Sequence, residues 1–188
     1  MNIFLLAMQV AACARYHVDS HVVKMILESA QLLCTACHLK GGTAPYKATH
    51  KNHPCSLWVR ESLSNWKFLR SLAKALNDEY KFRFNHTENH KSWDVIASLT
   101  EPPELEDKGL TPFAQAMPEQ YRVVGDPVEA YRKYYIGAKF HLAQWTKRRV
   151  PRCFREMREK YEREVEPKLV KRKRSPSTKP SKRVKKGT

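Results

Sequence analysis

The pattern of apolar and polar residues along the chain is helical wherever it is regular. Between Asp19 and His38, apolar side chains recur every three or four residues, and Gly41 and Gly42 end the run. This spacing gathers the apolar side chains on one side of a helix, so we expect a long helix over residues 19–38.

The same periodicity predicts further helices downstream. A second helix begins near Pro54 and presents one broad apolar face, formed by Trp58, Leu63, Trp66, Leu69, Leu72, Leu76 and Tyr80. A shorter helix contains Trp93, Ile96 and Ala97. Residues 152–166 alternate basic and acidic side chains at helical spacing, which is typical of a solvated helix.

The segment Asp126-Pro127-Val128-Glu129 is typical of a helix start. Asp can cap the free N–H groups, Pro is preset for the first turn, and Glu favours the positive end of the helix. We expect this helix to continue through Tyr131, Tyr134 and Tyr135.

Residues 100–125 contain four prolines and little periodicity, which predicts a long loop over the surface. Neither an internal repeat nor a regular series of strands is visible. The predicted fold class is therefore all-α, a compact single helical domain with a disordered basic C-terminal tail.

The charge of the chain is unevenly distributed. The formal net charge is +16 over 188 residues, and ten of these charges lie in residues 167–188, which contain no acid. We therefore expect a helical domain over residues 1–166 and a disordered Lys/Arg-rich tail over residues 167–188. The tail run Lys171-Arg172-Lys173-Arg174 suits either a DNA-binding arm or a nuclear-localisation signal.

Several classes of protein are disfavoured by the sequence. No apolar run approaches the roughly 18 to 20 residues that span a bilayer, so we expect no membrane partner. The apolar start has no Lys or Arg before it, which argues against a secretory signal. Five cysteines, an odd count, indicate free thiols in a reducing compartment. We expect an intracellular monomer in a nucleus or nucleoid, with a virus-encoded origin left open.

A stripe of polar residues runs along the first predicted helix. His17, His21, Lys24, Glu28 and Gln31 follow one another at steps of four, three, four and three, and their neighbours are apolar. Such groups are costly to bury unless they are paired or used. One interpretation is a functional site. The other is a solvated face with an ordinary pair of Lys24 and Glu28, although Lys before Glu is the weaker order.

Two other segments combine basic and aromatic residues. The loop over residues 47–60 leads into a helix start, where a phosphate could bind, and it contains Asn52, His53 and Arg60. Residues 131–149 contain Tyr131, Tyr134, Tyr135 and Lys139, which could stack on bases and hold phosphates. The alternative for residues 47–60 is a plain loop without a binding role. The alternative for residues 131–149 is that the tyrosines belong to the core.

Histidines and cysteines also cluster, so a metal must be considered. Cys34 and Cys37 have zinc-like spacing, but they fall within an apolar helix face and no second pair lies at the usual distance. We expect buried thiols and assign no metal ligand and no cofactor. A zinc-stabilised nucleic-acid module stays an alternative.

Four segments in order resemble the pyrimidine-dimer DNA glycosylase family, the phage endonuclease V type and its shorter bacterial relatives. They are Met1-Asn2-Ile3, residues 19–28 with His21, Lys24 and Glu28, Asn52-His53-Pro54 with Trp58, and residues 131–137. The resemblance spans residues 1–145.

The resemblance implies a helical fold and a DNA-repair glycosylase with abasic-site lyase activity. In that family the N-terminal α-amine attacks C1′ of the damaged nucleotide, and the resulting imine breaks the strand by β-elimination. A glutamate on the first long helix stabilises the sugar cation and moves protons. Carried over, Glu28 is the glutamate and the amine of Met1 is the nucleophile. The phage member exposes a threonine, whereas Asn2 here is too large for efficient methionine removal.

Chemistry suits this assignment, because an α-amine with a pKa of about 7.7 to 8.0 is partly neutral at physiological pH. The implied partner is damaged double-stranded DNA, carrying pyrimidine dimers or a related lesion. The contacts would come from His21, Lys24, Asn52, His53, Arg60, Tyr131, Tyr134, Tyr135 and Lys139, with the tail residues Lys171, Arg172, Lys173 and Arg174. The rival interpretation is a non-catalytic DNA-binding accessory protein, viral or nucleoid.

Overall fold

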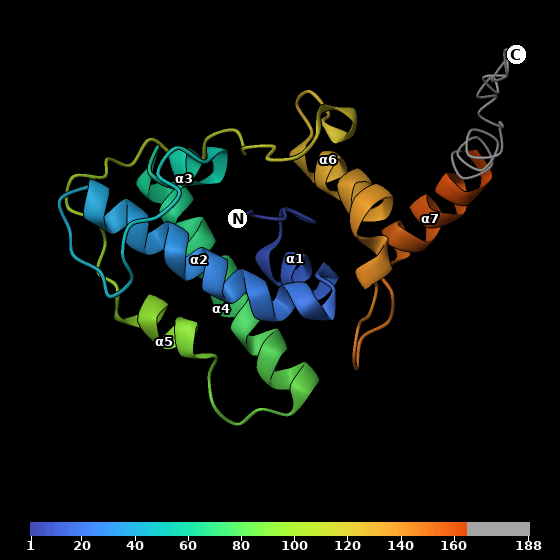
Figure 1. Cartoon of the computed structure of the whole chain (residues 1–188), viewed down its shortest axis with the longest axis horizontal. Coiled ribbons are helices and arrows are strands. Elements are labelled where there is room, and N and C mark those ends of the chain that lie inside the picture. The colour runs from blue at the N-terminus through green and yellow to red at the C-terminus, as the bar shows by residue number, and fades with distance from the viewer. Residues whose placement is uncertain (165–188) are drawn as a thin grey trace, which may run out of the picture.

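The computed structural model describes residues 1–164, which fold into helices without a strand (Figure 1). The α-helices are α1 (Val10–Tyr16), α2 (Asp19–Leu39), α3 (Pro54–Val59), α4 (Leu63–Phe84), α5 (Lys91–Ser98), α6 (Pro127–Tyr134) and α7 (Arg152–Glu164). Short 3-10 turns cover Glu119–Tyr121 and Phe140–Leu142, and a π-helical turn covers Tyr135–Lys139. The all-α prediction is confirmed. The predicted tail, with Lys171, Arg172, Lys173 and Arg174, lies outside the described residues.

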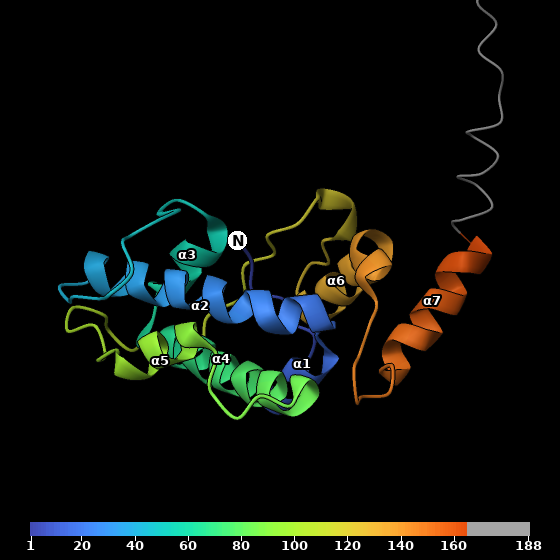
Figure 2. The same cartoon turned by 60° about the horizontal axis from the view of Figure 1, so that its bottom comes forward.

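Helix α2 is the centre of the fold and packs against α3, α4 and α5 (Figure 2). Its bounds confirm the helix predicted over residues 19–38. The helix ends where the N–H of Gly42 bonds to the carbonyl of Cys37, and Gly41 takes a φ of +74° that suits glycine. Only Val23, Lys24 and Leu27 form an exposed stripe in its middle.

The prediction of one helix from Pro54 to Tyr80 is wrong in one respect, because the chain breaks at residues 60–62. Helix α3 ends at Val59, and Ser62 starts α4 by accepting a hydrogen bond from the N–H of Ser64 at 3.3 Å. Serine is a favoured helix cap, so the break has a sequence signal. The break is not visible in the apolar pattern, because the apolar face continues across it and Trp58 and Trp66 are both buried in the core.

The predicted start at Asp126 is confirmed. Its Oδ1 accepts a hydrogen bond from the N–H of Glu129 at 2.9 Å, and Pro127 occupies the first turn of α6. Regular α-helix ends at Tyr134, one residue short of the prediction, and continues as the π turn. Gly137 belongs to this turn, and a Cβ there would come within 2.5 Å of the Tyr121 ring.

The long connection over residues 100–125 is irregular apart from one 3-10 turn, as predicted. It does not merely cover the surface, because Leu105 and Met117 are buried. The carbonyl of Thr111 accepts a hydrogen bond from Trp58 Nε1 at 3.3 Å, and Asn65 bonds to the same residue. The connection is therefore fixed against α3 and α4.

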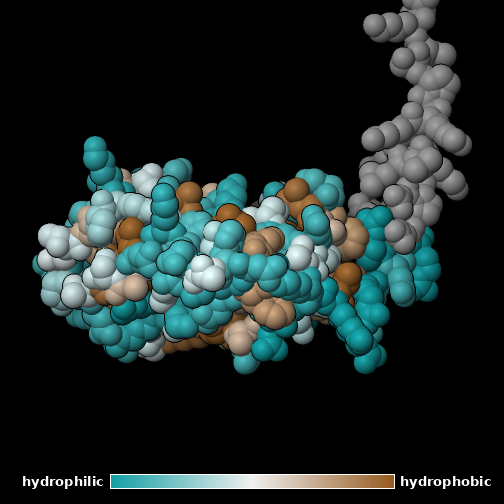
Figure 3. All heavy atoms as spheres, turned by 90° about the horizontal axis from the view of Figure 1, so that it is seen from below, coloured by the Kyte–Doolittle hydropathy of each residue, from teal (hydrophilic) through white to brown (hydrophobic). Residues whose placement is uncertain are grey.

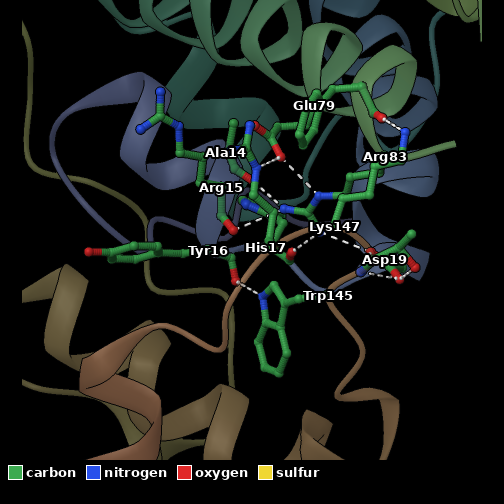
Figure 4. A network of polar contacts seen from close by, with 12 residues as sticks. Ala14, Arg15, Tyr16, His17, Asp19, Glu79, Arg83, Trp145 and Lys147 are labelled. Carbon is green, nitrogen blue, oxygen red and sulfur yellow. Dashed lines mark hydrogen bonds and ion pairs between the residues drawn. The ribbon is translucent and has the colours of Figure 1, made fainter. Parts of the chain in front are cut away.

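A buried polar network joins residues 14–19 to the segment that precedes α7 (Figure 4). Arg83 on α4 donates to Glu79, to Asp19 and to the carbonyls of Arg15 and His17 at 2.8 to 3.0 Å. Asp19 also accepts from the N–H and hydroxyl of Thr146. The network thus holds the end of α1, the start of α2 and residues 144–146 together.

Helix α2 is long and apolar enough to cross a membrane by length and composition, contrary to the expectation that no segment is. However, 67% of its apolar window is buried inside the fold, as in the core helix of a soluble protein. The face drawn in Figure 3 is mainly hydrophilic, with hydrophobic residues in scattered places. The apolar character of α2 is therefore accounted for by packing.

Helix α7 projects from the rest of the described chain (Figure 2). Its first residue, Arg152, pairs with Glu156 at 2.6 Å on an exposed face, and Arg158 lies 4.8 Å from the centre of the Phe140 ring. A charged helix with a solvated face is confirmed over the described part of the predicted range 152–166.

Candidate functional site at the N-terminal amine

The first seven residues form an irregular segment that runs through the core, with the N-terminus lying between α2 and α6 (Figure 1). Residues 3–7 are buried, which follows from their sequence Ile-Phe-Leu-Leu-Ala. Helix α6 holds this segment through Arg132, whose Nε donates to the carbonyl of Leu6 at 2.9 Å. The apolar start of the chain is therefore part of the hydrophobic core.

The amine of Met1 lies 3.8 Å from Oε2 of Glu28. Glu28 is 8% exposed and sits on the buried side of α2. The same Oε2 accepts a hydrogen bond from the backbone N–H of Asn2 at 2.7 Å. Two consecutive nitrogens of the chain therefore face one carboxylate.

Two further cationic or titratable groups surround this carboxylate. Lys24 Nζ lies 3.6 Å from Oε1 of Glu28 and is largely exposed. Burial lowers the pKa of His53, the charges of the N-terminus and His50 lower it further, and Glu28 opposes them. The charges of the Met1 amine and of Glu28 therefore both act on His53. We call Met1, Asn2, Lys24, Glu28 and His53 the amine site.

The side chain of Asn2 is fixed on every side. Its Oδ1 accepts from the N–H of Ile3 at 2.8 Å, lies 2.9 Å from the hydroxyl of Tyr131, and accepts from Cys55 Sγ at 3.6 Å. Its Nδ2 donates to the carbonyl of Ala116 at 2.9 Å. Residue 2 therefore connects the amine site to α3, α6 and the long connection.

The polar stripe is only partly formed as predicted. His17 precedes α2, lies in the link after α1 and is fully buried, with Nδ1 bonded to the carbonyl of Cys13. Burial lowers its pKa to about 3. The stripe is therefore limited to residues of α2.

His21 was predicted to contact DNA, and its burial makes that prediction wrong. Its ring stacks on Phe4 at 4.6 Å, and Nδ1 lies 2.6 Å from the hydroxyl of Tyr135. Burial lowers the pKa of His21 to about 4, and the charges of Lys139, Lys24 and His141 act in the same direction. Lys24 and Lys139 therefore place positive charge around this part of the fold.

Among the predicted aromatic contacts, Tyr131 and Tyr135 belong to the core. Tyr131 is 0% and Tyr135 2% exposed, so neither ring can stack on a base, and this prediction is wrong for both. Burial raises the pKa of each hydroxyl well above its ordinary value. Tyr134 is only half-buried, and Lys139 Nζ lies 5.2 Å from the centre of its ring. These two remain candidate DNA contacts.

The predicted phosphate site before α3 is not formed as expected. Helix α3 has six residues, and His53 Nδ1 accepts from the N–H of Cys55 at 3.2 Å, so one of the free amides is already used. Asn52 is exposed, whereas the half-buried Arg60 lies 3.5 Å from the hydroxyl of Ser56. His53 instead contributes to the amine site.

Cys34 and Cys37 are both buried inside the helical core. Cys37 Sγ donates to the carbonyl of Thr100 at 3.8 Å, and burial raises the pKa of its thiol to about 11. Among the side chains that the structure describes, no three of His, Cys, Asp or Glu are grouped to hold a metal ion.

The place of Asn2 in the amine site, with Cys55 and Tyr131 as partners of its side chain, was not predicted from the sequence. A polar residue before an uninterrupted apolar run was a signal for Asn2. Its partners lie 26, 53, 114 and 129 residues away, so no local pattern identifies them.

The arrangement suits nucleophilic chemistry by an amine next to a carboxylate that can exchange its proton. Low solvent exposure of Glu28 strengthens its interaction with any positive charge that develops nearby. No protein-family model matches the chain, and neither the curated proteins nor the solved structures that were searched contain a match.

Proposed function

We propose that the protein is a DNA-repair glycosylase with abasic-site lyase activity that acts on damaged DNA. The observation that carries this proposal is the 3.8 Å approach of the Met1 amine to a buried carboxylate of Glu28. A buried glutamate facing an α-amine is a costly arrangement, and the proposed chemistry uses both groups. The resemblance to the pyrimidine-dimer DNA glycosylases supports the same assignment.

The proposed reaction begins when the neutral amine attacks C1′ of the damaged nucleotide. A bond forms between the amine nitrogen and C1′ while the glycosidic bond breaks, and the departing base takes the electron pair and a proton. Opening of the sugar ring gives an imine. Loss of a proton from C2′ then expels the 3′-phosphate by β-elimination. The chemistry is supplied by the amine and calls for no cofactor.

Glu28 has two roles in this scheme. Its carboxylate stabilises the positive charge that develops on the sugar as the base leaves, an effect that is larger where solvent is excluded. It also accepts the proton that the amine must lose before attack, because it already lies beside that amine. Lys24 on its other oxygen faces solvent and is suited to hold a phosphate.

The proposed partner is damaged double-stranded DNA, bound by the protein as a monomer in an intracellular, reducing compartment. Lys24 belongs to the amine site, and the positive charges of Lys24 and Lys139 both lower the pKa of His21. The net charge of +16 supports a nucleic-acid partner. The base would have to leave the stack, which costs a few kcal/mol and less for a damaged pair.

Borohydride trapping tests this proposal. The full chain is incubated with a duplex containing an abasic site, and with ultraviolet-irradiated duplex, in the presence of borohydride. We expect a covalent adduct, strand cleavage without borohydride, and loss of both when the α-amine is blocked beforehand. Glu28→Gln should remove base excision and strand cleavage while it retains DNA binding. The matched control is Glu61→Gln, a solvent-exposed glutamate outside the amine site.

Mass spectrometry of the trapped peptide identifies the nucleophile. Should Met1 be removed in the cell, the nitrogen of Asn2 becomes the terminal amine, and it lies 2.7 Å from Glu28. Either terminal amine on the adduct supports the chemistry, whereas a lysine adduct refutes it. DNA binding without any adduct would favour the non-catalytic accessory protein. Stoichiometric zinc in the purified chain would favour the zinc-stabilised module.

A further inference from the structure

The strongest unassigned feature of the molecule is the set of contacts around the side chain of Asn2. A side chain at the second residue of a chain is ordinarily solvated and mobile. Here the carboxamide of Asn2 has partners in the long connection, in α3 and in α6. The buried Tyr131, which DNA cannot reach, is one of them.

We propose that Asn2 and Tyr131 are positioning residues that hold the terminal amine against Glu28. This inference rests on the proposed function, because it names the groups that orient its nucleophile. Only the backbone torsions of Met1 separate the terminal amine from Asn2. The position of the amine therefore depends on how firmly residue 2 is fixed. Neither Asn2 nor Tyr131 needs to touch the DNA for this role.

The backbone and the side chain of Asn2 make different hydrogen bonds with different effects. The backbone N–H of Asn2 bonds to Glu28, which sets the distance between the chain and the carboxylate. The side chain fixes the orientation of residue 2. Its Oδ1 accepts a hydrogen bond from the Tyr131 hydroxyl, and its Nδ2 donates one to the carbonyl of Ala116. Such preorganisation matters because misplacement of a reacting group by about 1 Å can lower a rate by about 100-fold.

Tyr131 is itself held in place, which makes it a suitable anchor. Its hydroxyl lies 2.8 Å from the carbonyl of Ala114 and 3.3 Å from the N–H of Ala116, in addition to Asn2. Its ring packs edge-on against Phe4 with the ring centres 5.9 Å apart. The anchor therefore belongs to the rigid core and not to a surface loop.

The primary test uses Tyr131→Phe, because this substitution removes only a hydroxyl and leaves residue 2 and methionine processing untouched. The matched control is Tyr46→Phe, which removes a hydroxyl bonded to Ser92 at 3.2 Å outside the amine site. Asn2→Leu is the second variant, since leucine fills similar space without hydrogen bonds. Its intact mass must show that the same residue is at the N-terminus.

Two measurements are made on each variant. The first is the single-turnover rate of borohydride-trapped adduct formation on abasic-site duplex, together with the dissociation constant for that duplex. The second is the rate of reductive methylation of the α-amine by formaldehyde and cyanoborohydride without DNA. We expect Tyr131→Phe and Asn2→Leu to slow adduct formation at least about tenfold at an unchanged dissociation constant. Methylation should become faster, and Tyr46→Phe should match the wild type in both.

The outcomes separate this inference from the proposed function. If the wild type forms an adduct and Tyr131→Phe and Asn2→Leu form it at the same rate, the positioning role is overturned and the proposed function stands. A loss of rate shared by Tyr46→Phe also overturns it, since general destabilisation would then explain the effect. Absence of any adduct in the wild type refutes the proposed function. In that case the methylation rates still test whether Asn2 and Tyr131 fix the terminus. Rates in Tyr131→Phe and Asn2→Leu equal to that of the wild type would refute this fixation, and faster rates would support it.

Discussion

Arg83 Nη1 lies 3.0 Å from Oδ1 of Asp19, in a place where the arginine side chain has no exposed surface. The pair connects α4 to the first residue of α2, the helix that bears Glu28. The start of that helix lacks a side-chain cap, so its position depends on this contact and on the chain around Thr146.

Replacement of Arg83 by Met should destabilise the fold strongly. The change leaves Asp19 and Glu79 without their common partner and frees carbonyls at the end of α1, and breaking a buried pair costs about 3 to 5 kcal/mol. Urea denaturation followed by circular dichroism measures this loss. The comparison is Lys74→Met, which removes an exposed pair with Asp78 and should change the free energy of unfolding by less than about 1 kcal/mol. Equal effects would show that the buried network is not needed.

An uncleaved residue added before Met1 should abolish lyase activity without unfolding the protein. The extension moves the amine about 3.8 Å along the chain, away from Glu28, and rates fall by about 100-fold for much smaller displacements. Strand cleavage of abasic-site duplex is the measurement, with the same extension at the C-terminus as the control. Full activity of the N-terminally extended chain would rule out the amine of Met1 as the nucleophile, because that nitrogen is then part of a peptide bond.

Acid should weaken the fold through His17. Its pKa is about 3 in the folded protein against 6.5 unfolded, because burial disfavours the charged ring. The unfolded chain therefore binds a proton that the folded chain excludes, so this stability is present above pH 6.5 and is lost as the pH falls towards 3. Between neutral pH and pH near 5 the loss from one such histidine is about 2 kcal/mol.

The variant His17→Leu should reduce this pH dependence, measured as the difference in urea stability between the two pH values. His21 shifts in the same direction, so part of the dependence should remain. The exposed His86 offers a control, since His86→Gln should leave the pH dependence unchanged. Identical curves for wild type and His17→Leu would contradict the buried neutral ring.

Lys24 and Lys139 should contribute to DNA affinity by binding phosphates. Lys24→Gln and Lys139→Gln should each weaken binding and reduce the slope of log affinity against log salt by about 0.9 for each phosphate that is no longer neutralised. Removal of residues 167–188, which carry ten of the net charges, should reduce the slope more. Fluorescence anisotropy at several salt concentrations measures this, with Lys74→Gln as the control. Unchanged slopes for Lys24→Gln and Lys139→Gln would place the DNA elsewhere.

Local patterns in the sequence predict the helices well because their causes are local. The extent of α2 follows from its apolar spacing and Gly41, and the start of α6 follows from Asp126 and Pro127. The break before α4 was missed because Ser62 interrupts an apolar pattern that continues on both sides.

The candidate site was predicted only in part, since its geometry depends on contacts between distant residues. Periodicity placed Glu28 in a polar stripe between apolar residues, and the family resemblance supplied Met1 as its partner. Burial of Tyr131 and Tyr135 was not predictable, because a tyrosine beside basic residues looks the same whether its ring enters the core or faces DNA. The role of Asn2 follows only from the fold.

The contact between Asn2 and Tyr131 joins residues 129 positions apart, which has a consequence for synthesis of the chain. Residues 1–7 leave the ribosome first, but α6, which holds them through Tyr131 and Arg132, is made much later. Contacts of such high sequence separation form late, after costly loop closure. An incomplete chain therefore has a free terminus and no assembled amine site, so the proposed nucleophile is positioned only in a molecule whose helical core is already complete.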